Sequence, residues 1–80
     1  MKIPRDLGGP QLAKALRLLG YEIVRQDGSH LRLTTERDGE HHITIPAHAS
    51  LKVGTLNSIL KLVAAHHQIS VGELLQMLDL

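Results

Sequence analysis

Two short turn sequences divide the middle of the chain into three runs of β-type residues, and this division constrains the fold more than any other feature. The runs extend from Tyr21 to Gln26, from Ser29 to Glu36 and from Glu40 to Ile45, and their Ile, Val, Tyr and Thr content with alternating polarity indicates strands. Asp27-Gly28 favours a two-residue hairpin, whereas Arg37-Asp38-Gly39 favours a three-residue hairpin with a left-handed glycine. The sequence therefore predicts a three-stranded antiparallel meander.

The two hairpins also predict which side chains share a face of this sheet. Because side chains alternate along a strand, the apolar residues lie on one face, and His30, Arg25 and Arg32 lie on the other. The same register turns Glu22 inward, so we expect the first strand to bulge or end early at its start. The predicted pairs are Arg25 with His30, Val24 with Leu31, Leu33 with Ile43, and Leu31 with Ile45.

Helical periodicity flanks the strands on both sides. Pro10 suits the first turn of a helix that ends at Gly20, and Ser70 with Glu73 forms a capping box before a third helix over residues 71–77. The strongest helical pattern follows Pro46 at spacing i, i+3, i+4, i+7, i+8 and consists of Leu56, Ile59, Leu60, Val63 and Ala64. The predicted class is α+β in the order α-β-β-β-α-α, with the helices on one sheet face and a single domain over residues 1–80.

Composition limits the kind of domain that this chain can form. Eighty residues hold one core, and that core is aliphatic because Tyr21 is the only aromatic residue. The absence of cysteine, of a signal peptide over residues 1–6 and of a long apolar run leads us to expect a cytoplasmic location. The formal charge of +1 argues against a strongly basic nucleic-acid module, although residues 1–37 carry seven Lys or Arg against four acids.

His30 is the candidate functional residue that the first turn singles out. A histidine directly after a tight turn has a fixed backbone and an exposed ring. An ordinary imidazole pKa of about 6.5 lets such a ring accept or donate a proton near neutral pH. An ordinary surface histidine fits the same pattern, so the turn alone does not decide between the two.

Four other histidines form two adjacent pairs, His41-His42 and His66-His67. Adjacent strand residues point to opposite faces, and adjacent helix residues diverge by about 100°, so neither pair makes a good two-ligand metal clamp. We therefore expect no metal. Lys14 and Arg17 share one face of the first helix, where they could contact an RNA backbone or simply form its solvated side.

Three short motifs occur in order along the chain: Gly28-Ser29-His30, Pro46-Ala47-His48 and Gly54-Thr55-Leu56. With these motifs the sequence resembles the HicA toxin family, also described as YcfA-like, and the likeness extends from Ile3-Pro4-Arg5 to Ile69-Ser70. The resemblance implies a fold like the double-stranded-RNA-binding domain and metal-independent cleavage of mRNA without a cofactor. It also implies a HicB-like antitoxin partner that covers the outward sheet face.

The resemblance assigns the catalytic role to His30. RNA carries its own nucleophile in the 2′-hydroxyl, so the resemblance implies a general base that takes this proton, and a nearby cation would stabilise the developing phosphate charge. For most of the other candidates a structural role in the turn, the strand, the loop or the helix cap remains the alternative. The candidate RNA-binding residues are Gly28, Ser29, Arg25, Arg32, His48 and Thr55.

Two departures from the family pattern affect these expectations. Ala47 stands where a basic residue is expected between Pro46 and His48, and residues 65–68 replace a short Ala-Gly turn, which predicts a longer second helix. Two rival functions stay open at this point. They are a noncatalytic RNA-binding module of the same fold and an interaction protein whose polar sheet face binds only another protein.

Overall fold

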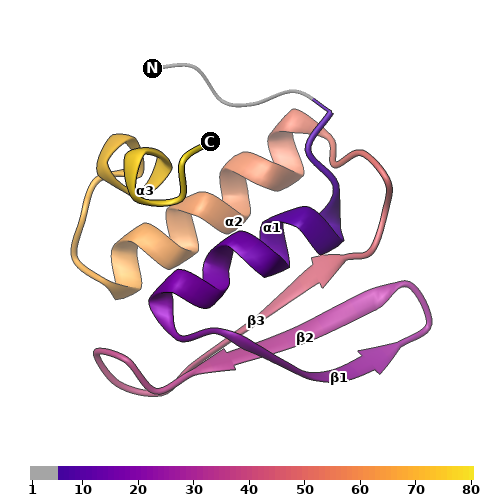
Figure 1. Cartoon of the computed structure of the whole chain (residues 1–80), viewed down its shortest axis with the longest axis horizontal. Coiled ribbons are helices and arrows are strands. Elements are labelled where there is room, and N and C mark those ends of the chain that lie inside the picture. The colour runs from indigo at the N-terminus through magenta and orange to yellow at the C-terminus, as the bar shows by residue number, and fades with distance from the viewer. Residues whose placement is uncertain (1–5) are drawn as a thin grey trace.

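The computed structural model describes residues 6–80, in the predicted order of one helix, three strands and two helices (Figure 1). The likeness that begins at Ile3-Pro4-Arg5 therefore starts outside the described residues. The elements are α1 (Gly9–Leu16), the 3₁₀ turn η1 (Arg17–Leu19), β1 (Glu22–Asp27), β2 (His30–Thr35), β3 (His41–Pro46), α2 (Val53–His66) and α3 (Val71–Met77).

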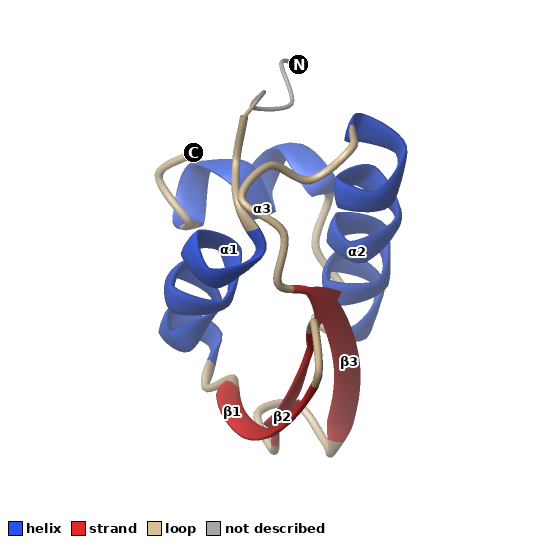
Figure 2. Cartoon of the chain, turned by 90° about the vertical axis from the view of Figure 1, so that its right-hand side faces the viewer, coloured by secondary structure: helices blue, strands red, loops and turns tan. Residues whose placement is uncertain are grey.

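The helices cover one face of the antiparallel sheet β1-β2-β3, and the other face is open (Figure 2). The core lies between these two layers. The five apolar residues predicted for α2 are all buried there, as are Leu31, Leu33, Ile43 and Ile45 of the sheet. Burial of each such side chain contributes about 1.5–3 kcal/mol, which orients the sheet and leaves its polar face toward solvent.

The predicted helix ends are confirmed at two positions. Gly20 follows η1 with φ +83°, the left-handed conformation that glycine adopts without steric cost. Ser70 Oγ accepts from the backbone N–H of Glu73 at 3.0 Å, so the capping box begins α3 at Val71. The helix α2 extends to His66, into the segment that departs from the family's short turn.

The predicted pairing of the second and third strands is confirmed. Leu31 pairs with Ile45 and Leu33 pairs with Ile43. His30 pairs with Pro46, so the first residue of β2 lies beside the last residue of β3. The alternating burial of β2 therefore leaves His30 on the open face.

The predicted pairing of the first two strands is wrong: the turn lies one residue further along the chain, which moves the β1 partner of His30 by two residues, from Arg25 to Asp27. The two turn residues are Gly28 and Ser29 instead of Asp27 and Gly28, because Asp27 belongs to β1 and pairs with His30. Of these two turn residues only Gly28 has positive φ, at +58°, which is the type II′ pattern with glycine first, whereas type I′ requires positive φ at both.

This shift changes which β1 residues lie opposite which β2 residues. Arg25 pairs with Arg32 instead of His30, and Val24, predicted to lie inward, is 62% exposed. The pairing skips Val24 between Ile23 and Arg25, which is the irregularity expected near the start of this strand.

Candidate functional site

The Gly28-Ser29 turn places His30 at one corner of the open sheet face. His30 begins β2, is exposed, and lies between two paired neighbours, Asp27 on β1 and Pro46 on β3. Both neighbouring strands hold the backbone of His30, whereas its ring faces solvent. A substrate can therefore reach the imidazole without a change in the fold.

The loop after β3 lies directly beside this turn. The backbone N–H of Ala47 donates to the Ser29 carbonyl at 2.6 Å, and the N–H of Gly9 at the start of α1 donates to the His48 carbonyl at 2.9 Å. These two hydrogen bonds fix Pro46-Ala47-His48 between the turn and α1. The structure thus brings His48 and His30 to the same corner, and both side chains are exposed.

Two arginines form the next row of the open face. Arg25 and Arg32 occupy directly paired positions, one pair away from Asp27 and His30. Arg25 Nε donates to Asp27 Oδ1 at 2.8 Å in an ion pair whose side chains are 67% and 51% exposed. Among the described residues Arg32 forms no ion pair, so Arg32 is the cation of this row whose charge is not offset by a carboxylate.

A hollow of about 360 Å³ lies at this row, and both arginines line it. It is widely open, as suits a strand of nucleic acid that passes over a surface rather than a ligand enclosed in a pocket. The hollow with its two arginines lies next to His30 along β2. A linear chain could therefore pass over both without leaving the sheet.

Thr55 is the one predicted site residue that the structure leaves apart. It lies half-exposed in the first turn of α2, and no hydrogen bond of residues 6–80 joins it to the Gly28-Ser29 turn. The 46–52 loop separates it from His30 along the chain. Thr55 therefore remains a prediction that the geometry of the turn does not support.

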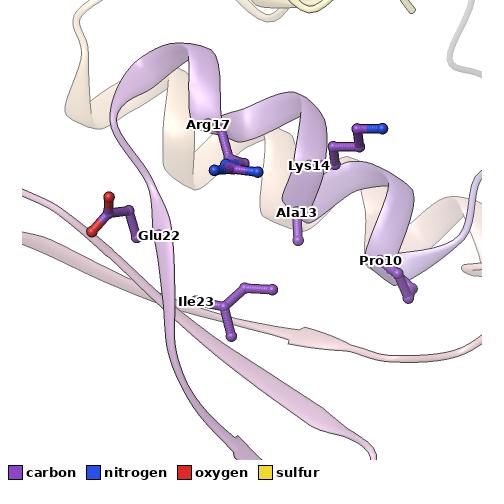
Figure 3. A pocket seen from close by; sticks show the side chains of 6 residues that line it. All are labelled: Pro10, Ala13, Lys14, Arg17, Glu22 and Ile23. Atoms are coloured by element: carbon purple, nitrogen blue, oxygen red, sulfur yellow. The ribbon is translucent and has the colours of Figure 1, made fainter.

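A second hollow, between α1 and β1, contains the two cations that share the face of the first helix (Figure 3). Lys14 and Arg17 line it together with Glu22 and the apolar side chains of Ala13 and Ile23. Its volume is about 490 Å³. The carboxylate of Glu22 offsets part of the positive charge, so this hollow selects for phosphate less clearly than the row that contains Arg32.

Asp27 is the site residue that the sequence reasoning missed. Placing the turn at Asp27-Gly28 put this carboxylate inside the turn, away from the pairing, and left Arg25 beside His30. The dipeptide Gly28-Ser29 was the signal that could have found it, because a glycine followed by a small polar residue suits a type II′ turn. With that turn Asp27 pairs with His30 and neutralises Arg25.

No group of three or more His, Cys, Asp or Glu side chains of residues 6–80 is arranged to hold a metal ion. No helix of the same residues has the length and apolar character needed to cross a membrane.

Comparison with known proteins identifies the family of this chain. Residues 9–64 match the family model described as the HicA toxin of bacterial toxin-antitoxin, a segment that contains the turn, His30 and both flanking strands. No significant match was found among curated proteins or among solved structures.

The chain therefore belongs to the HicA toxin family. These toxins are generally mRNA interferases, act on RNA and pair with an antitoxin.

Proposed function

We propose that this chain is a toxin-type mRNA endonuclease in which His30 is the general base. The observation that supports the proposal is the position of His30: an exposed imidazole on a rigid strand start, beside a second exposed histidine and one row from two arginines. An extended RNA strand can present its sugar to His30 while an adjacent phosphate lies over the arginine row.

The chemistry needs only one proton acceptor to begin. The imidazole of His30 takes the proton of a 2′-hydroxyl, and the resulting oxygen attacks the adjacent phosphorus. The bond from phosphorus to the 5′-oxygen breaks, which leaves a 2′,3′-cyclic phosphate on one product and a 5′-hydroxyl on the other. The leaving 5′-oxygen receives a proton from a general acid, and His48 at the same corner is our candidate for that role.

Arg32 is the residue that we assign to the phosphate. Charge develops on the non-bridging oxygens as the 2′-oxygen attacks, and a positioned cation stabilises that charge. Arg25 contributes only after it leaves Asp27, although an exposed pair of this kind is worth about 0–1 kcal/mol and opens at small cost. Gly28 and Ser29 supply backbone amides and a hydroxyl beside the reacting sugar.

The partner proposed for this chain is a HicB-like antitoxin that covers the open sheet face. A protein on this face would bury His30 and the arginine row together and so exclude RNA. The proposal requires no bound metal, because the 2′-hydroxyl supplies the nucleophile and side chains supply the proton transfers. Full cleavage in the presence of a chelator is the corresponding expectation.

The test is RNA cleavage by purified wild type, His30→Gln and Lys61→Gln. Lys61 is exposed on α2, in the helical layer, so Lys61→Gln introduces the same side chain without touching the open sheet face. We expect His30→Gln to reduce the cleavage rate about 10²–10⁴-fold, the usual contribution of a general base, and Lys61→Gln to retain it.

Equal activity of wild type and His30→Gln would contradict the assignment of His30. RNA binding without cleavage by the wild type would instead identify a noncatalytic RNA-binding module. Circular dichroism of each variant controls for loss of fold.

A further inference from the structure

Five side chains join the β2-β3 hairpin to the C-terminal end of α2, at the end of the sheet opposite His30. This histidine cluster consists of Tyr21, Asp38, His41, His66 and His67. Its two α2 residues belong to the segment that departs from the family pattern. The cluster shares no residue with the proposed RNA site.

A chain of three hydrogen bonds runs through the cluster. Asp38 Oδ2 lies 2.9 Å from His67 Nδ1, His67 Nε2 lies 3.2 Å from the Tyr21 hydroxyl, and that hydroxyl lies 2.7 Å from His41 Nδ1. The Tyr21 side chain is fully buried, and the His67 side chain is 3% exposed. Because water does not reach Tyr21 and His67 freely, the direction of each hydrogen bond between these two groups depends on the protonation of their partners.

His66 completes the contact between the two elements. Its Nε2–H donates to the carbonyls of Arg37 and Gly39, both at 3.0 Å, which ties the hairpin loop to α2. Its ring stacks on that of His41 with centroids 4.2 Å apart and planes 8° apart. Two positive charges at that separation would repel each other strongly, so the stack tolerates at most one protonated ring.

The connectivity of Asp38, His67 and Tyr21 matches that of a carboxylate, a base and a nucleophile, but burial excludes catalysis. No substrate reaches the phenol oxygen of Tyr21, which lies inside the core. Burial also raises the pKa of Tyr21 to about 12, so the hydroxyl keeps its proton near neutral pH. Metal binding is equally unsupported, since no three ligands converge among residues 6–80.

Counting protons on the Tyr21 hydroxyl gives the cluster two allowed states. The hydroxyl has one proton to donate and faces two ring nitrogens, so one nitrogen accepts and the other donates. In the first state Tyr21 donates to neutral His67, and His41 donates from Nδ1. In the second state His67 carries an extra proton, donates to both Asp38 and Tyr21, and the hydroxyl reverses toward His41.

We propose that the histidine cluster is a proton-linked switch that accepts one proton at His67 and releases the hairpin from α2 when a second proton reaches His41. The first proton changes His41 from the Nδ1–H to the Nε2–H tautomer and leaves every hydrogen bond in place. The second proton leaves the Tyr21 hydroxyl without an acceptor, because both facing ring nitrogens then carry a proton, and it gives the stack with His66 the one charge that it tolerates.

The charged groups around the cluster agree with this order. Burial and the neighbouring rings of His66, His67 and His42 lower the pKa of His41, which delays its protonation. The hydrogen bond from His67, with smaller help from Arg37 and His66, lowers the pKa of Asp38, so the carboxylate stays ionised to pair with protonated His67. Arg37 itself points its guanidinium to the Leu18 carbonyl at 3.0 Å.

The direct test is an NMR titration of the ring nitrogens in the unmodified chain. We expect His67 to gain a proton and His41 to change tautomer at the same midpoint. Faster amide exchange in residues 37–41 should follow only at lower pH. Protonation of His41 before His67, or the absence of a tautomer change, would overturn the proposal, and neither result depends on whether the chain cleaves RNA.

A variant pair gives an independent readout. Glutamine at position 41 can donate to or accept from Tyr21 but cannot take up a proton, so His41→Gln should make acid unfolding less steep. A difference of one bound proton changes the unfolding equilibrium about tenfold per pH unit, and this is the dependence expected to disappear. The control His30→Gln, at the opposite end of the sheet, should keep the wild-type profile. Equal profiles for both variants would contradict the switch.

Discussion

Arg32 and Arg25 occupy paired positions on the open face but differ in what each can bind. Asp27 holds Arg25 at 2.8 Å, whereas Arg32 has no ion pair among residues 6–80. The difference arises from the pairing of β1, which sets Asp27 opposite His30 and Arg25 opposite Arg32. The position of one carboxylate therefore determines which of the two arginines has its charge offset.

Substitution of each arginine tests this difference. We expect Arg32→Ala to reduce RNA cleavage about tenfold or more, because it removes the available cation from the phosphate. Arg25→Ala should have a smaller effect, and Asp27→Asn should strengthen RNA binding, because it frees Arg25. Cleavage rates and RNA affinities of the three variants at low salt provide the measurement, and a larger loss in Arg25→Ala than in Arg32→Ala would contradict the assignment.

The turn glycine gives a second prediction for a single residue. A Cβ added at Gly28 or at Gly54 meets no atom within 4 Å, but only Gly28 has positive φ. Gly28→Ala should therefore lower the free energy of unfolding by about 1–3 kcal/mol. Gly54→Ala, in the first turn of α2, should be neutral or stabilising by about 0.5–1 kcal/mol. Chemical denaturation of both variants measures the difference, and equal effects would show that backbone strain is not the cause.

At the scale of elements, the sequence predicted each helix and strand where one physical signal dominated. The apolar spacing of α2 and the capping box of α3 are local patterns, and the structure confirms both. The pairing of β2 with β3 followed from the turn and the apolar alternation together. These agreements fixed the open face and the place of His30 on it.

The pairing of β1 could not be predicted in the same way. Every residue of β1 is exposed, so no burial pattern selects its register, and the turn alone had to decide. Two glycine-containing dipeptides overlap at this turn, and the preference for Asp27-Gly28 gave the wrong one. The histidine cluster was also beyond prediction, because it joins residues up to 46 positions apart whose contact depends on how α2 docks on the hairpin.

Thr35 forms hydrogen bonds that link two of these elements, and its substitution tests how much this link contributes to stability. Its buried hydroxyl donates to the Leu19 carbonyl at 2.8 Å and accepts from the Arg37 N–H at 3.1 Å, so it links η1 to the β2-β3 hairpin. Thr35→Val keeps the shape but leaves both backbone groups unpaired, and we expect a loss of about 1–3 kcal/mol in unfolding free energy.

The matched control for that substitution is Thr44→Val on the exposed face of β3. It should change the unfolding free energy by about 0.5 kcal/mol or less, because the Thr44 side chain is not buried. Thermal denaturation of the two variants side by side makes the comparison, and similar losses in both would argue against the hydrogen-bonded link.

In the whole molecule, the core that stabilises the fold lies on one side of the sheet, and the surface proposed to bind RNA is the other side. The helices lie on one side of the sheet (Figure 2). The core and the histidine cluster lie on that side, whereas the outer face presents His30 and the arginines. An RNA or an antitoxin can therefore occupy the outer face without disturbing the core. This arrangement fits a family whose members act on RNA and pair with an antitoxin.

The buried tyrosine predicts how the stability of the whole fold depends on alkaline pH. Burial raises the pKa of Tyr21 to about 12, against about 10 in an unfolded chain. Between these values the unfolded chain loses a proton that the folded chain keeps, so the free energy of unfolding falls as the pH rises. Denaturation over this range should show a steeper fall for the wild type than for Tyr21→Phe, and parallel profiles would contradict it.

The central claim is that the imidazole of His30 activates a 2′-hydroxyl, and the chemical ends of the cleaved RNA test it most directly. Wild type is predicted to leave 2′,3′-cyclic phosphate and 5′-hydroxyl ends, with the rate of their formation reduced about 10²–10⁴-fold in His30→Gln. Products with 3′-hydroxyl and 5′-phosphate ends, or cyclic phosphate formed by His30→Gln at the wild-type rate, would contradict the claim.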